Sequence, residues 1–273
     1  MNMPTKFQLP KITFKRVALT LFAAGLLALA DAFFLEPNWI QVTHHAVPAH
    51  ISRPLKIAHL TDLHTSGLGF RERSLLGSLD REKPDVIVIT GDTLSPWGSY
   101  DDERPLLSSL HAPLGVWLVR GNWENWRQID KEQKFYQENG VRFLLNRNSQ
   151  LTPEVWLVGL DDATFGNANL EKALAGITPG AYRIALFHSP LFFAATAGQY
   201  NLALAGHTHG GQVRLPFFHA IWLPAGIGPY TEGWFEKNKS RLYVSRGLGM
   251  TILPLRFFCR PELDIVTIEP MDK

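Results

Sequence analysis

Seven polar side chains follow short apolar runs in this sequence, and all are of types that bind metal ions. The five runs are rich in β-branched residues, as buried strands are, and a carboxylate, amide or imidazole follows each within a few residues. Because ligands collect beyond the carboxyl ends of strands in open α/β sheets, we expect these side chains to share one site. In chain order they are Asp62, His64, Asp92, Asn122, His188, His207 and His209.

The mixture of donor atoms restricts the metal. Carboxylate, amide oxygen and imidazole together suit Mn, Fe, Co, Ni or Zn better than Mg or Ca alone. Seven side chains are too many for one ion, whereas two ions that share a carboxylate account for the number. Two ions roughly 3.5–4 Å apart activate water for in-line attack on phosphorus. Each residue alone has an ordinary structural explanation, such as an aspartate that caps a helix, so the prediction depends on the ordered set.

The elements that must position these residues alternate between short apolar runs and amphipathic stretches. Two helices are predicted at Glu72–Glu82 and Trp126–Glu138. Six strands are predicted at Leu55–Leu60, Asp85–Thr90, Val116–Val119, Val155–Val158, Arg183–Phe187 and Leu202–Ala205. This alternation indicates one α/β domain, which we place at residues 54–273, after a polar, proline-containing connector at 36–53.

The blocks D-x-H, G-D, G-N, H and G-H-x-H, in this order from Ile57 to Gly211, resemble the calcineurin-like metallophosphoesterase superfamily. The later blocks Ser245–Gly249 and Pro261–Leu263 resemble its YaeI/YkuE-type phosphodiesterase branch. The resemblance implies a four-layer α/β-β/α sandwich of two mixed sheets with two divalent ions at one edge. It implies that one ion takes Asp62, His64 and His209, that the other takes Asn122, His188 and His207, and that Asp92 bridges them. Among these residues the catalytic ones would be Asp92, Asn122 and His188.

One position departs from the family pattern. Many members have a histidine after the asparagine of the G-N block, where it stabilises the transition state or protonates the leaving group; here the residue is Trp123. An indole offers only its ring N–H and has no proton to transfer in the useful pH range. General acid catalysis matters least for leaving groups that are weak bases, such as a phosphate leaving from a diphosphate. The superfamily enzymes that cleave UDP-2,3-diacylglucosamine, a lipid diphosphate, also depart from histidine here in at least one branch.

The segment Val17–Leu35 is apolar except for Asp31 and follows four basic residues. As a helix its 19 residues would span about 28 Å, close to the hydrocarbon thickness of a bilayer. We favour a single membrane anchor at residues 1–35 over a signal peptide cleaved near Ala28–Ala30, because Phe33–Leu35 prolongs the apolar run. The positive-inside rule would place the domain outside the membrane, whereas a UDP-linked substrate is cytoplasmic, so the face of the membrane stays open.

Residues 216–235 are rich in aromatic residues, proline and glycine and follow the G-H-x-H block. Two arrangements are open. The segment could form a hydrophobic rim that receives an acyl chain or touches the bilayer, or it could pack its aromatic rings inward.

Composition excludes other classes of protein. The chain has 273 residues, 45% of them hydrophobic, which is too apolar for a disordered protein. The net charge is +2, and the first 16 residues supply four of the positive charges, so the body lacks the basic surface of a nucleic-acid-binding protein. The single Cys259 excludes a zinc site with several thiolates.

The sequence therefore predicts a membrane-associated phosphoesterase with two divalent ions of unknown identity. Its substrate would be a phosphodiester or diphosphate, phosphorylated and lipid-linked, such as UDP-2,3-diacylglucosamine. The alternatives are a phosphodiesterase of broad specificity and a non-catalytic scaffold with the same fold. Scaffolds tend to lose metal ligands, whereas all seven are present here.

Overall fold

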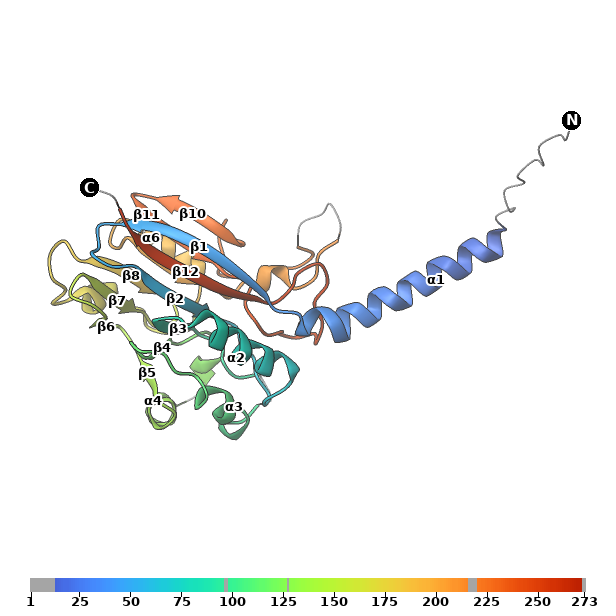
Figure 1. The fold of residues 1–273 in the computed structure, drawn as a ribbon, viewed down its shortest axis with the longest axis horizontal. Coiled ribbons are helices and arrows are strands. Elements are labelled where there is room, and N and C mark those ends of the chain that lie inside the picture. Colours follow the sequence, from blue (N-terminus) through green and yellow to red (C-terminus); the bar gives the residue numbers. More distant parts are fainter. Residues whose placement is uncertain (1–12, 96–97, 127, 216–219, 272–273) are drawn as a thin grey trace, which may run out of the picture.

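The computed structural model describes residues 13–95, 98–126, 128–215 and 220–271 of the chain (Figure 1). Two six-stranded mixed sheets form its centre. The first has the order β1 (Gln41–Ala49), β12 (Glu262–Pro270), β2 (Leu55–Leu60), β3 (Val86–Thr90), β4 (Val116–Val119) and β5 (Val141–Phe143). The second has the order β10 (Gly233–Lys237), β11 (Ser240–Val244), β9 (Leu202–Ala205), β8 (Tyr182–Leu186), β7 (Val155–Gly159) and β6 (Arg147–Gln150).

Most strands that lead to the predicted ligands run in one direction within each sheet. Strands β2, β3, β4 and β5 are parallel, and so are β7, β8, β9 and β11. The antiparallel pairs are β12 with β2, β10 with β11, and β6 with β7. Each sheet therefore presents several carboxyl strand ends at the same edge.

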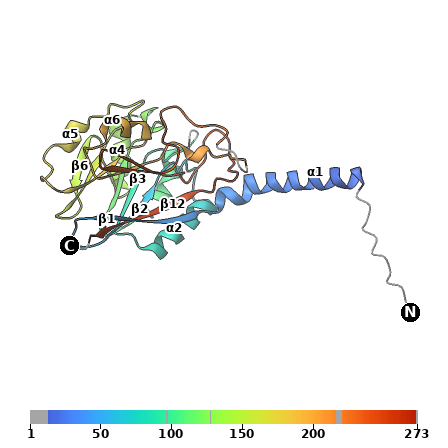
Figure 2. The same ribbon diagram turned by 90° about the horizontal axis from the view of Figure 1, so that it is seen from above.

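Helices cover the outer faces of the two sheets. They are α2 (Phe70–Glu82), α3 (Tyr100–Leu107), α4 (Ile129–Glu138), α5 (Leu170–Leu174) and α6 (Phe193–Thr196). A further helix, α1 (Phe14–Ala30), lies outside these layers. Helices α2, α3 and α4 pack on the first sheet, and α5 and α6 pack on the second. The layers are thus helix, sheet, sheet and helix, as the four-layer sandwich requires (Figure 2).

Side-chain alternation along the strands produces this layering. On β2, Ile57 faces the other sheet, whereas Ala58 faces the helices. On β3, Val88 faces the other sheet, whereas Ile87 faces the helices. All four side chains are fully buried. Such strands are covered on both faces and read in the sequence as continuous apolar runs, which explains why they could be predicted.

The six predicted strands and both predicted helices are confirmed to within three residues at each end. The sequence prediction contains no strand after Ala205, however, and places residues 36–53 in a connector. Both points are wrong: β1 lies within 36–53, and β10, β11 and β12 follow Ala205. Strand β1 is an edge strand paired along its whole length with β12, from Gln41 opposite Glu262 to Ala49 opposite Pro270. Polar residues in β1 and in β12 interrupt the apolar pattern by which a strand is recognised in the sequence.

The N-terminal helical segment Phe14–Asn38 projects from the sandwich and is long and apolar enough to cross a membrane (Figures 1 and 2). Almost none of it is buried, but its C-terminal end is attached to the domain. The carbonyl of the buried Ala32 accepts a hydrogen bond from the backbone N–H of Arg256 at 3.0 Å. The carboxylate of Glu36 accepts from the backbone N–H groups of Phe258 and Cys259.

Candidate metal centre

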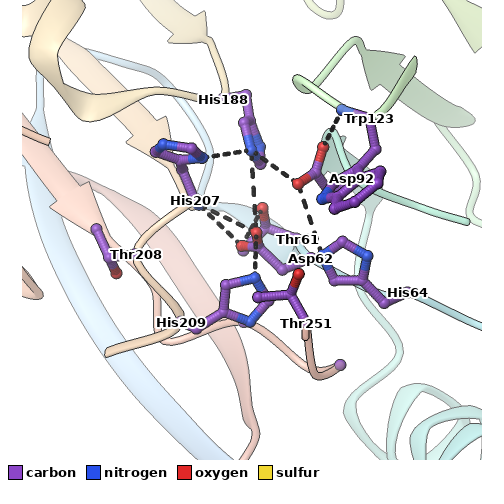
Figure 3. A network of polar contacts seen from close by, with 12 residues as sticks. Thr61, Asp62, His64, Asp92, Trp123, His188, His207, Thr208, His209 and Thr251 are labelled. Atoms are coloured by element: carbon purple, nitrogen blue, oxygen red, sulfur yellow. Dashed lines mark hydrogen bonds and ion pairs between the residues drawn. The ribbon is translucent and has the colours of Figure 1, made fainter. Parts of the chain in front are cut away.

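The loops that follow five strands converge at one edge of the sandwich (Figure 3). Strands β2, β3 and β4 of the first sheet lead to four of the predicted ligands, and β8 and β9 of the second lead to the other three. All seven predicted site residues lie in these loops: Asp62 and His64 after β2, Asp92 after β3, Asn122 after β4, His188 after β8, and His207 and His209 after β9.

One cluster consists of Asp62, His64 and His209, all buried. Their potential ligand atoms lie within 4.8 Å of one another. The Nε2 atom of His209 is 3.3 Å from Asp62 Oδ1, and the two imidazole rings stack at 5.1 Å between centroids. This spacing could hold one metal ion.

A second cluster consists of Asp92, His188 and His207, again buried and within the same 4.8 Å limit. His188 Nε2 lies 3.2 Å from Asp92 Oδ2 and 3.1 Å from His207 Nδ1. The amide oxygen of Asn122 lies 3.0 Å from the same His188 Nε2. One carboxylate, one amide and two imidazoles therefore converge on a second position that could hold an ion.

Buried imidazole nitrogens without partners support metal binding at these positions. Within the described part of the chain, neither ring nitrogen of His64 nor Nδ1 of His209 has a hydrogen-bond partner. A buried polar atom without a partner costs about 1–3 kcal/mol, so native structures rarely leave several of them together. All three nitrogens belong to the first cluster, where a metal ion could use such nitrogens as ligands, and the donor set suits borderline divalent ions.

Hydrogen bonds to main-chain carbonyls orient the histidines of the second cluster. His188 donates from Nδ1 to the carbonyl of Thr90 at 2.7 Å, which directs Nε2 into the centre. His207 donates from Nε2 to the carbonyl of Ala225 at 2.7 Å, which directs Nδ1 into the centre. Such second contacts fix the tautomer and the ring orientation of metal-binding histidines.

The backbone of the centre is strained. Asp62, His64, Asp92, His207 and His209 all have positive φ angles, between 39° and 70°. Residues other than glycine are uncommon in this region, and strained residues cluster at functional sites. The five residues coincide with five of the seven predicted ligands, which is independent support for a functional role of these loops.

Two glycines permit the close approach of these loops. A Cβ atom on Gly206 would lie 2.3 Å from Asp62 Oδ2, and one on Gly121 would lie 2.2 Å from Asp92 Oδ1. Neither contact is possible for a real side chain. The glycines of the G-N and G-H-x-H blocks therefore make room for the two carboxylates.

Charge and burial determine protonation in the metal-free centre. Burial raises the pKa of Asp92, but His188 outweighs burial and brings the pKa below the usual aspartate value. Burial lowers the pKa of His188, but Asp92 and Asp62 outweigh it and raise the pKa well above the usual histidine value. Burial lowers the pKa of His209 to about 3. The two carboxylates therefore favour the protonated form of His188, and a metal ion at this position would compete with that proton.

Glu124, two residues after Asn122, is a buried residue to which the sequence analysis assigned no role. Its buried carboxylate accepts hydrogen bonds from the backbone N–H groups of Asp92, Thr93 and Gly121, at 2.7–2.9 Å. It thus joins the loop after β3 to the loop after β4. A carboxylate engaged in this way is a positioning group and does not replace the missing proton donor at Trp123, whose ring lies edge-on to His64 at 6.2 Å.

The structure contains a third group of potential ligands, His45, Glu262 and Asp264, which the sequence analysis did not identify. The oxygens of Glu262 accept from Tyr243 and Arg246, both at 3.0 Å. Asp264 accepts from Thr43 at 3.0 Å. Side chains of the protein therefore donate hydrogen bonds to both carboxylates, and the guanidinium of Arg246 provides a positive charge beside Glu262.

The aromatic segment 216–235 combines both predicted arrangements. Residues 216–219 lie outside the described residues. Ile221 and Trp222 are exposed and line a groove, whereas Tyr230 and Trp234 pack on the core clusters of the second sheet and of the inter-sheet layer. The first part is thus a rim and the second part is packed inward.

Comparisons with known proteins agree with the geometry. A family model described as calcineurin-like phosphoesterase matches residues 55–211, which include all seven predicted ligands. An uncharacterized metallophosphoesterase of Bacillus subtilis, YkuE, is 33% identical, and the match covers 90% of this chain and 93% of that protein. The Escherichia coli protein named phosphodiesterase YaeI is 27% identical, with 90% and 96% covered.

A protein of Bos taurus named transmembrane protein with metallophosphoesterase domain is 29% identical over 82% of this chain and 55% of its own length. The matches with the two bacterial relatives cover nearly the whole of each chain. The fold, the paired ligand clusters and the family match lead to one conclusion. The chain belongs to the calcineurin-like phosphoesterase family of metal-dependent phosphoester hydrolases.

Proposed function

We propose that this protein is a membrane-associated phosphodiesterase or diphosphatase with two divalent ions in its centre. Asp62, His64 and His209 would hold one ion, Asn122, His188 and His207 would hold the other, and Asp92 would serve both. We assign catalysis to Asp92, Asn122 and His188; a side-chain oxygen of each of the first two lies within 3.2 Å of His188 Nε2. Two bound ions would supply Lewis acidity, both to activate the attacking water and to neutralise charge on the phosphoryl group.

The position of Asp92 carries this proposal. Its Oδ2 atom lies 3.2 Å from His188 Nε2 and 3.6 Å from His64 Nε2, so one oxygen faces both clusters. Its other oxygen accepts a hydrogen bond from the backbone N–H of Trp123 at 3.0 Å. The shared carboxylate is therefore held in place by the protein itself.

Trp123 cannot act as a general acid, so the leaving group must be able to depart without receiving a proton from this position. The indole cannot deliver a proton, and the carboxylate of Glu124 is engaged by three backbone N–H groups. We infer that the substrate has a leaving group that is a weak base, such as the phosphate of a diphosphate or an activated diester. Water attacks one phosphorus and gives up a proton to solvent, the P–O bond to the leaving group breaks, and the leaving group departs as its unprotonated anion.

A lipid-linked diphosphate such as UDP-2,3-diacylglucosamine combines a suitable leaving group with a membrane location. Three observations support it: the N-terminal helix is long enough to cross a membrane, apolar residues are exposed beside the centre, and one relative is named a transmembrane protein. The name of YaeI favours the second candidate, a phosphodiesterase, and does not specify its substrate.

An assay of the full chain in detergent separates these functions. We would remove metal with a chelator, reload with Mn²⁺, and compare methyl phosphate, bis(p-nitrophenyl) phosphate and a lipid diphosphate. We expect metal-dependent hydrolysis of the diester and the lipid diphosphate and weak hydrolysis of alkyl monoesters. Hydrolysis of simple diesters alone would favour the broad phosphodiesterase. Two bound ions without hydrolysis of any compound would favour a non-catalytic scaffold.

A further inference from the structure

An apolar groove adjoins the metal centre. It has a volume of about 430 Å³, within the range of small-molecule sites, and three chain segments line it. His209 and Thr208 form its inner end, so the groove shares a residue with the first metal cluster. Figure 3 shows Thr251, another lining residue, beside His209.

Hydrogen bonds hold the three walls of the groove together. The side chain of Gln212 donates to the carbonyls of Thr251 and Leu253 and accepts from the backbone N–H of Thr251. The backbone N–H of Ile221 donates to the carbonyl of Val213 at 3.2 Å. The groove is therefore a preformed feature of the fold.

Large apolar side chains are exposed along its outer walls. Ile221, Trp222, Ile252 and Leu253 are 52–76% exposed. Ile252 also has a φ of 62°, a conformation that is a genuine outlier for a β-branched residue. The fold thus holds a strained isoleucine toward solvent, where it adds nothing to the core.

The exposed walls lie near the base of the helix that could cross a membrane. The loop after Leu253 binds that helix through Arg256, Phe258 and Cys259, and its Phe257 pairs with Val213 of the groove. In both ribbon views α1 leaves the domain beside these loops (Figures 1 and 2). A membrane crossed by α1 would therefore lie close to the outer end of the groove.

We propose that this groove binds the hydrocarbon chain of a lipid-linked phosphoester, drawn from the bilayer, while its phosphoryl group lies at the metal centre. This inference rests on the function proposed above and adds the site that selects the lipid. Continuity with His209, exposed apolar walls and the neighbouring membrane helix all point to a chain that runs from the bilayer to the ions. Each methylene that is fully buried improves binding by about fourfold.

The first test measures binding without turnover. The full chain in lipid nanodiscs is irradiated with dodecyl phosphate that carries a diazirine at the end of its chain, and labelled peptides are identified by mass spectrometry. We expect labelling within residues 211–215, 220–222 and 251–253, with competition by dodecyl phosphate but not by methyl phosphate. Labelling that is no stronger there than around Met271, at the far end of β12, would overturn the proposal.

The second test measures selectivity with p-nitrophenyl methyl, butyl, octyl and dodecyl phosphates, which share one leaving group. Leu253→Asp makes the wall polar, and Val213→Trp fills the groove while its surface stays apolar. Both variants should lower the ratio of kcat/KM for the dodecyl ester to kcat/KM for the methyl ester by about tenfold or more. Val213→Trp should leave kcat/KM for the methyl and butyl esters unchanged. The exposed control Met271→Glu should leave the ratio unchanged.

The outcomes separate the two proposals. Groove labelling without hydrolysis of any ester would contradict the proposed function and leave the groove assignment standing. Hydrolysis of all esters with a ratio unaffected by the groove variants would overturn the groove assignment alone. A smaller oligomer for Leu253→Asp, measured by light scattering, would assign the groove to a second copy of this chain and would also overturn the proposal.

Discussion

Single residues of the centre are positioned independently of any bound ion. Asp92 is held by the backbone N–H of Trp123, and Asp62 accepts from the backbone N–H of His207 and the hydroxyl of Thr61, both at 2.9 Å. These bonds aim the carboxylates, and hydrogen bonds to the carbonyls of Thr90 and Ala225 aim His188 and His207. Substitutions at this scale should therefore change chemistry more than they change folding.

Replacing Asp92 tests the shared ligand. Asp92→Asn keeps the shape and the bond from Trp123 but removes the negative charge that faces both clusters. We expect activity to fall by more than about 100-fold, beyond the usual effect of residues that only support metal ligands, and bound metal to fall below two ions per chain. Metal content by mass spectrometry and thermal unfolding would be measured together, with the exposed Asp80→Asn as the control. Full activity in Asp92→Asn would rule out the dinuclear centre.

Trp123 leads to a prediction about leaving groups. Without a proton donor at this position, kcat/KM should depend steeply on the pKa of the leaving alcohol or phenol in a series of diesters. Trp123→His should flatten the dependence, with gains of up to about 10²–10⁴-fold on the poorest leaving groups, because an imidazole can donate a proton. Trp123→Phe is the matched control and should stay steep. A flat dependence in the unmodified protein would remove the basis for inferring an activated substrate.

At the scale of elements, the centre depends on loops from separate strands that are tied to one another. Glu124 joins the loops after β3 and β4, and Arg256 joins the loop after β9 to the loop before β12. Arg256 is fully buried and donates to the carbonyls of His209, Gly249 and Cys259, among others. The ligand geometry thus comes from cross-links between loops as well as from the strands.

Glu124→Gln tests this cross-linking. The amide can accept through only one oxygen and would turn donors toward backbone N–H groups, so buried donors would lose their partner. We expect a loss of about 1–3 kcal/mol in the free energy of unfolding and a metal affinity weaker by about 10–100-fold. Urea denaturation and metal titration would measure the two effects. The exposed Glu138→Gln should change the free energy of unfolding by no more than about 0.5 kcal/mol. Unchanged stability and affinity in Glu124→Gln would show that the loops hold their positions without it.

At the scale of the whole molecule, the N-terminal helix and the catalytic domain meet at a small, specific contact. Ala32 and Glu36 contact the loop at Arg256–Cys259, and Arg256 in turn contacts the loop of His209. The orientation of the helix is therefore connected to the loops around the metal centre and the apolar groove. The domain boundary at residues 35 and 36 that we propose falls inside this contact.

Two truncations separate anchoring from support. A chain that begins at Asp31 keeps Ala32 and Glu36, and we expect it to leave the membrane fraction while it binds two ions and hydrolyses p-nitrophenyl methyl phosphate. A chain that begins at Trp39 leaves two backbone donors without Glu36, at a cost of about 1–3 kcal/mol. Its Tm should fall by about 2–4 °C for each kcal/mol lost. If the chain that begins at Asp31 bound no metal ions, the helix before Asp31 would belong to the domain core.

The sequence by itself predicted the ends of the strands that carry the ligands and the residues of the candidate metal centre. The strands that carry the ligands are buried on both faces, so each reads as an apolar run that ends in Asp62, Asp92, Asn122, His188 or His207, and these side chains meet because parallel strands end at one edge. Only the tertiary structure placed β12 between β1 and β2. The residues of β12 pair with residues more than 200 positions earlier in the chain, and polar side chains interrupt the apolar pattern of β1 and β12. The tertiary structure alone assigned Glu124 to the loops, and it alone formed the groove. Those features depend on contacts between segments far apart in the chain, which no local pattern of residues records.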